Sequence, residues 1–181
     1  MSEDARDRAV KLQLRLAQLD RIDSCRNDFL TFVRAMWPEF IAGEHHKIIA
    51  EKFQRVADGS LKRLIINMAP RHTKSEFASN FLPAWFIGRN PNMKIIQATH
   101  TTELAVGFGR KVKNLIDSEI YRDIFPDLAL ASDAKASGRW STSKGGEYYA
   151  VGVGGALAGR GADLCIIDDP VSEQDALSPT A

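Results

Sequence analysis

Residues 64–77 have the sequence LIINMAPRHTKSEF, and this stretch decides the expected fold. The apolar run 64–68 predicts a buried strand, which a proline brings to an end. A basic and polar turn follows, and Lys74 and Ser75 then open a new segment. The apolar residues of that segment have helical spacing: Phe77, Phe81 and Trp85. The stretch therefore predicts a strand, a tight turn and a helix in direct succession.

This succession is the layout of a phosphate-binding P-loop. The first N–H groups of a helix have no carbonyl partners, so they can bind an anion, and the helix dipole favours negative charge there. Lys74 would reach the β- and γ-phosphates of a nucleotide, and the Ser75 hydroxyl would bind Mg²⁺.

Two positions depart from the usual pattern G-x-x-x-x-G-K-S/T. Met68 and Thr73 stand where the pattern has glycine. Thr73 is the more serious change, because a β-branched residue resists positive φ. A strand, a loop and a helix that carry a solvated lysine remain the alternative interpretation.

A second motif lies in residues 162–170, which have the sequence ADLCIIDDP. Four apolar residues followed by two carboxylates are typical of a Walker B strand. Such a strand is buried and places Asp168 at its carboxyl end, where it can hold Mg²⁺ through water. Asp169 stands where a carboxylate usually polarises the attacking water. Acidic residues often end strands, so the motif gains weight from the P-loop that precedes it; together they predict a nucleotide site.

The chain between the two motifs contains a further strand and helix. Residues 93–98 predict a buried strand, and Thr101 or Thr102 can cap a helix that runs to about Ile116. Buried strands that each precede a helix predict an α/β fold with a mostly parallel sheet flanked by helices. The polar residues 99–102 either cap the helix or face a ligand crevice at the sheet edge.

Residues 140–155 predict β-structure around a Gly145-Gly146 turn. Five glycines follow in quick succession: Gly152, Gly154, Gly155, Gly159 and Gly161. They indicate either a flexible loop or a close approach of the backbone to a ligand or to another strand. Arg160 would be presented on this loop.

Helices are predicted before the P-loop. Residues 3–22 combine alternating charge with two apolar stripes, and residues 28–36 and 44–56 predict shorter helices. His45 and His46 are adjacent, so they point about 100° apart on a helix and make a weak metal motif. We expect one packed and one exposed histidine.

The composition is that of an ordinary globular protein. The 181 residues include 44% hydrophobic and 26% charged residues, with a net charge of +1. This charge is too small to create the basic field that would indicate a nucleic-acid partner. No apolar run is long enough to span a membrane. The N-terminus lacks the apolar core of a signal peptide. Cys25 and Cys165 are interpreted as free thiols in a reducing cytoplasm.

Four segments of the chain resemble the N-terminal ATPase domain of the large terminase subunit, the DNA-packaging motor of tailed bacteriophages. They are GEHHKIIA (43–50), MAPRHTKSE (68–76), GGEYYAVGVGGALAGRGADL (145–164) and IIDDPV (166–171). The resemblance covers roughly residues 27–171, and its most specific part is the glycine-rich run into Asp-Asp-Pro. Terminases carry a deviant P-loop, which explains the missing first glycine, whereas Thr73 still departs from the family.

The resemblance implies an additional-strand P-loop NTPase fold, preceded by N-terminal helices, that binds ATP and Mg²⁺. Ser75 and Asp168 would hold Mg²⁺, and Lys74, Arg71 and Asp169 would be catalytic. His46 matches the region that contacts adenine. The full set of expected cofactor-binding residues is His46, Pro70, Arg71, His72, Thr73, Lys74, Ser75 and Glu76. A neighbouring subunit would supply an arginine, for which Arg139 and Arg160 are candidates.

The resemblance also implies an organisation and partners. Residues 1–26 would form a helical extension and residues 27–181 a truncated ATPase domain without the family's nuclease, so we expect weak or absent hydrolysis. The implied partners are double-stranded DNA, the portal protein, the small terminase subunit and further copies of the chain in a ring, in the host cell cytoplasm and without a membrane. A DEAD-like helicase domain and a nucleotide-free scaffold that binds portal or small terminase remain alternatives.

Overall fold

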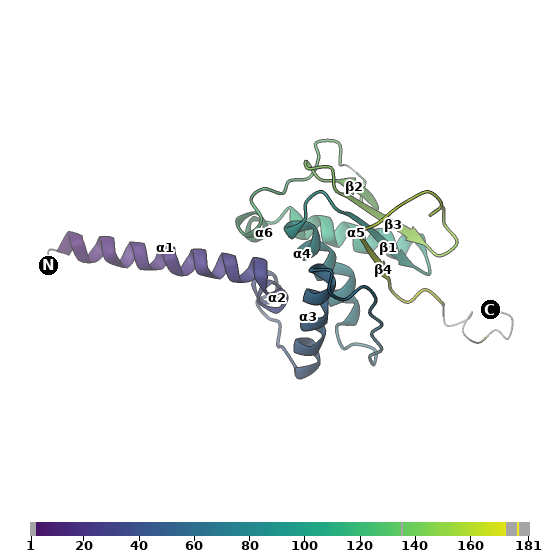
Figure 1. The fold of residues 1–181 in the computed structure, drawn as a ribbon, viewed down its shortest axis with the longest axis horizontal. Coiled ribbons are helices and arrows are strands. Elements are labelled where there is room, and N and C mark those ends of the chain that lie inside the picture. Colours follow the sequence, from purple (N-terminus) through teal and green to yellow (C-terminus); the bar gives the residue numbers. More distant parts are fainter. Residues whose placement is uncertain (1–2, 135, 173–176, 178–181) are drawn as a thin grey trace.

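The computed structural model describes residues 3–134, 136–172 and 177, and shows an α/β body from which one long helix projects (Figure 1). The end of the expected ATPase domain, residues 173–176 and 178–181, lies outside the described residues. Among the helices that are described, none combines the length and the apolar character that crossing a membrane requires.

A four-stranded sheet in the order β2-β3-β1-β4 forms the centre of the body. Strands β3 (Glu147–Gly152) and β4 (Leu164–Ile167) both run parallel to β1 (Lys94–Thr99), which lies between them. Only β2 (Arg139–Ser141) is antiparallel, and it pairs with β3 through the predicted glycine turn. The predicted α/β class and mostly parallel sheet are therefore confirmed.

One face of the sheet carries the main hydrophobic core. The face formed by Ile95, Tyr148 and Leu164 packs against α5 (Thr102–Ile116) and α4 (Leu82–Arg89). The other face holds a small separate cluster of Ile96, Ala98 and Val151. There β4 is less covered than expected, since Ile167 is 63% exposed. The expected burial of this strand therefore holds for one face only, because the helices cover only that face.

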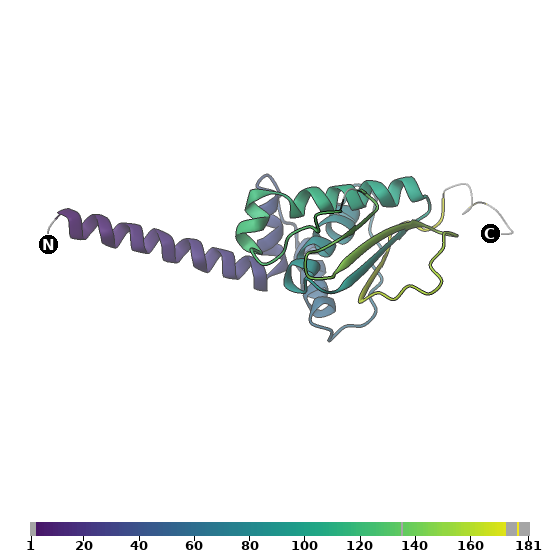
Figure 2. The same ribbon diagram turned by 90° about the horizontal axis from the view of Figure 1, so that it is seen from above.

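The N-terminal helices join the same core. They are α1 (Glu3–Asn27), α2 (Phe29–Met36) and α3 (Glu44–Ala57). A later helix, α6 (Glu119–Ile124), packs beside them. α1 is anchored at its C-terminal end, where the indole Nε1 of Trp85 donates to the carbonyl of Cys25 at 2.9 Å. The rest of α1 extends away from the body in both views (Figures 1 and 2). The large apolar residues of its two predicted stripes are exposed: Val10, Leu12, Leu14, Leu16 and Leu19.

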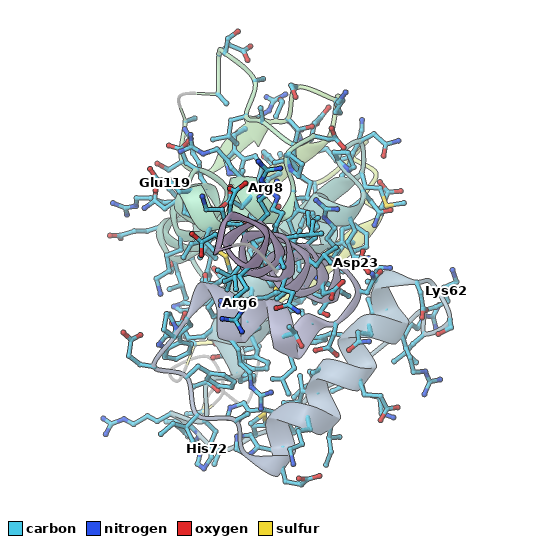
Figure 3. The ribbon with its side chains drawn as sticks, turned by 90° about the vertical axis from the view of Figure 1, so that its left-hand side faces the viewer. Arg6, Arg8, Asp23, Lys62, His72 and Glu119 are labelled. Carbon is cyan, nitrogen blue, oxygen red and sulfur yellow. The ribbon has the colours of Figure 1, made fainter. Side chains whose placement is uncertain are left out.

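Residues 64–68 do not form the predicted strand. The segment is extended and runs back along α3, so that Lys62 lies near one end of that helix and His72 near the other (Figure 3). A strand needs a neighbour that completes its hydrogen-bond ladder, and no described strand lies beside this segment. A cavity of about 270 Å³ lies between the segment and α3.

The expected α-helix begins at Lys74 but continues as a π-helical segment, η1 (Glu76–Phe81). Pro83 has no N–H with which to bond the carbonyl four residues earlier, so the local ladder changes its spacing. The N–H of Leu82 instead reaches the carbonyl of Phe77. The three predicted core residues of this segment are all buried: Phe77, Phe81 and Trp85.

Two glycines of α5 provide a matched test of how this helix packs on the sheet. A Cβ added at Gly109 would collide with the carbonyl oxygen of Ser137, whereas one added at Gly107 meets nothing within 4 Å. We expect Gly107→Ala to stabilise the protein by about 0.5–1 kcal/mol, because alanine loses less backbone entropy in a helix. Gly109→Ala should destabilise it by about 1–3 kcal/mol, through forced shifts in the packed interface. Urea denaturation measures both values, and equal effects would contradict this packing.

Candidate functional site

Strand β4 and the turn after residues 64–68 bring the two predicted motifs together. The ammonium of Lys74 lies 2.7 Å from Asp169 Oδ1 and 3.7 Å from Asp168 Oδ1. Both aspartates directly follow β4, at the carboxyl edge of the parallel strands. This is the edge at which α/β sheets bind ligands. The arrangement therefore joins one cation and two carboxylates that are remote in the sequence.

Asp168 is held by a buried polar network that the sequence analysis missed. Its carboxylate is only 6% exposed, and its Oδ2 accepts a hydrogen bond from Ser79 Oγ at 2.8 Å. Gln97 Nε2 donates in turn to Ser79 Oγ at 3.2 Å. These bonds leave Oδ1 facing Lys74. A glutamine inside the apolar run 95–98 was the available signal, because a buried amide needs partners.

Lys74 and the aspartates form a compact charged group. The hydrogen bond that Lys74 donates to Asp169 is the largest influence on the lysine and raises its pKa, so Lys74 stays protonated at neutral pH. One ammonium against two carboxylates leaves an excess of negative charge. Carboxylate and hydroxyl oxygens are the ligands that Mg²⁺ prefers, and the Ser75 side chain makes no capping hydrogen bond. Ser75 and Asp168 thus fit the donor chemistry of a magnesium site.

Two residues of the turn before Lys74 have a left-handed backbone conformation. Thr73 has φ +61° and Arg71 has φ +63°, both in the left-handed region. Thr73 therefore adopts the conformation for which the motif uses glycine, although β-branched residues rarely do so. Residues that alternate into this region turn successive N–H groups toward one side, which forms an anion-binding concavity.

His46 is buried and contacts this turn through Thr73. The ring is 6% exposed and packs against Phe40 and Phe77, with centroids 4.8 and 4.9 Å away. Its Nδ1 accepts from the N–H of Gly43 at 2.9 Å, and its Nε2 lies 2.7 Å from Thr73 Oγ1. Both ring nitrogens are thus engaged by protein groups. The contact of His46 with adenine stays a prediction.

Three further residues of the expected site lie on the turn or at the start of η1. Pro70 and His72 are exposed on the turn, where His72 Nδ1 donates to the carbonyl of Pro70. Glu76 turns away, since its carboxylate pairs with Lys111 at 3.2 Å and accepts from Asn80.

Of the two candidate arginines, Arg139 lies on β2 and Arg160 lies in the loop before β4. Arg160 stacks over the ring of Tyr149 at 4.0 Å, and Arg139 is the register partner of that tyrosine. Tyr149 packs with the small cluster on the face opposite the main core. Neither arginine is thus grouped with Lys74 in the same chain, and a role in a neighbouring subunit stays a prediction for both.

The remaining polar and glycine signals have structural explanations. Thr101 caps α5 by accepting from the N–H of Leu104, so capping accounts for this threonine. A Cβ on Gly152 would lie 2.6 Å from the backbone nitrogen of Thr102, so the backbone at Gly152 closely approaches the start of α5 rather than another strand. Both cysteines are free, as predicted. The described residues include no cluster of three or more His, Cys, Asp or Glu side chains that could hold a metal.

Comparisons with protein-family models, with curated proteins and with solved structures found no match to this chain.

His46 makes stability depend on pH. Burial is the main cause that lowers its pKa, and the neighbouring His45 and His72 add to the effect. An unfolded histidine has a pKa of about 6.5, so just below that pH the unfolded chain binds more protons than the native one. We expect the free energy of unfolding to fall as the pH drops from about 7 to 5. Urea denaturation across this range should show a weaker dependence for His46→Phe, and equal slopes would exclude the effect.

Ser79 should contribute to stability through Asp168. Ser79→Ala leaves a buried carboxylate oxygen without its donor, which we expect to cost about 1–3 kcal/mol. Ser75→Ala is the matched control on the same helical segment, and should change the free energy of unfolding by less than about 0.5 kcal/mol. Denaturation of the two variants measures the difference, and a Ser79→Ala variant as stable as the control would show that Asp168 does not depend on this bond.

Proposed function

We propose that this chain is the ATPase domain of a large terminase subunit, which binds Mg-ATP and powers the movement of double-stranded DNA into a phage procapsid. The observation that carries the proposal is the meeting of Lys74 with Asp168 and Asp169 at the carboxyl edge of a parallel sheet. A lysine at a phosphate-binding turn, beside a strand that ends in carboxylates, is the arrangement that nucleotide hydrolysis uses.

Different residues would bind the phosphates, hold Mg²⁺ and orient the attacking water. The N–H groups of the turn, together with Arg71 and Lys74, would bind the phosphates, while Ser75 and Asp168 would hold Mg²⁺. Bound Mg²⁺ neutralises charge on the phosphate oxygens. The phosphates compete with Asp169 for the Lys74 ammonium, which releases the Asp169 carboxylate. At 66% exposure this carboxylate is open to water, so it can orient a water molecule for attack.

The proposal extends to an assembly in the host cell cytoplasm. Copies of the chain in a ring would act on DNA together with the portal protein and the small terminase subunit. Arg139 or Arg160 would then reach the nucleotide of a neighbouring copy. An arginine supplied in this way is worth about 10³–10⁵ in rate in other P-loop enzymes.

The nucleotide site is tested first by calorimetric titration of Mg-ATP into the purified chain and into Lys74→Ala. We expect the parent to bind and the variant to lose at least about tenfold in affinity, because a hydrogen bond to a charged group is worth about 1.5–3 kcal/mol. Lys62→Ala is the matched control, since this lysine lies at the far end of α3 from the turn (Figure 3). It should bind as the parent does.

The outcomes separate the proposal from its alternatives. A folded parent that binds no Mg-ATP would overturn the nucleotide site, and retention of portal or small terminase by that chain would favour a scaffold. Binding accompanied by ATP-dependent separation of DNA strands would favour a helicase. Circular dichroism of each variant shows whether a loss of binding reflects a loss of fold.

A further inference from the structure

Thr73 holds a backbone conformation that its own chemistry disfavours. Its φ of +61° belongs to the left-handed region, which glycine adopts freely and β-branched residues almost never adopt. Such a conformation persists only where the surrounding structure enforces it. Something outside the turn must therefore hold Thr73 in place.

We propose that His46 is a positioning residue that holds Thr73 in the left-handed conformation and so keeps the phosphate-binding turn formed without its glycine. The contact that supports this is the 2.7 Å hydrogen bond between His46 Nε2 and Thr73 Oγ1. The effect on nucleotide binding rests on the proposed function, whereas the effect on the turn itself does not.

The hydrogen bonds around His46 all run in one direction. The N–H of Gly43 donates to Nδ1, which requires this nitrogen to be unprotonated in the neutral ring. Nε2 then carries the proton and donates to Thr73 Oγ1. The Thr73 hydroxyl in turn donates to the carbonyl of His72 at 2.6 Å. A relay of three bonds thus links the start of α3 to the turn.

The ring of His46 is itself fixed, which lets it act as a support. Phe40 and Phe77 enclose it, and the bond from Gly43 holds it at the N-terminus of α3. Phe77 also belongs to η1, the segment that opens at the turn. The position of Thr73 Oγ1 is therefore set by two helical elements.

Loss of this bond would let Thr73 relax toward negative φ. That rotation turns the peptide planes beside Thr73, and the N–H groups of the turn would no longer point toward one anion. Glycine at position 73 would need no such support, because it populates positive φ freely. The requirement for His46 should therefore disappear when residue 73 is glycine.

The test is a double-mutant cycle between positions 46 and 73. His46→Phe keeps an aromatic ring in the core and removes both hydrogen bonds. In the parent we expect it to weaken Mg-ATP binding about tenfold, the loss of roughly one hydrogen bond. In a Thr73→Gly background the same change should alter affinity by less than about twofold. Thr73→Val, which keeps the β-branch and removes the hydroxyl, should weaken binding as His46→Phe does, and the two losses should not add.

An equal loss from His46→Phe in both backgrounds would overturn the proposal, because packing alone would then explain it. No loss in the parent would overturn it as well. Urea denaturation of the parent, of His46→Phe, of Thr73→Gly and of the double variant gives an independent reading without nucleotide. His46→Phe should destabilise the parent more than it destabilises the Thr73→Gly variant. If the parent binds no Mg-ATP, the proposed function fails, and this second cycle alone decides whether His46 supports the turn.

Discussion

The shared ion pair of Lys74 with Asp168 and Asp169 is the contact on which the organisation of the site depends. A buried carboxylate such as Asp168 is tolerated only with a nearby cation and with hydrogen bonds to its oxygens. Lys74 supplies the charge from the turn, and Ser79 supplies the hydrogen bond from the helix that follows it. The Asp168 carboxylate at the edge of the sheet therefore contacts both the turn and the helix.

The fold and the site differed in how far the sequence could predict them. The β1 strand, the Thr101 cap and the turn between β2 and β3 were predicted, because each depends on signals within a few residues. The strand expected at 64–68 failed, since an apolar run shows that a segment is suited to a sheet but not whether a neighbouring strand lies beside it. Ser79 and the His46 relay were missed for the same reason: their partners lie far away in the sequence.

Thr73 has a backbone conformation that β-branched residues rarely adopt. Glycine is favoured at such positions because it carries no Cβ, so its freedom is local. Thr73 also has positive φ, and its hydroxyl is hydrogen-bonded to His46 Nε2 and to the carbonyl of His72. In the proposed role of His46, this contact takes the place of the conformational freedom of glycine, so the turn would depend on α3.

Because the long N-terminal helix is attached near one end, small rotations at the attachment would become large displacements at its free end. Its 25 residues span roughly 37 Å at 1.5 Å per residue, and it is attached to the body at one end. Trp85, which donates the hydrogen bond to Cys25, lies on α4, the continuation of the helical segment that follows Lys74. A rotation of that attachment by about 10° would carry the free end of α1 through about 6 Å. A fluorophore near Arg6 or Arg8, at the outer end of this arm, would convert small movements of the anchor into distances that energy transfer can resolve (Figure 3).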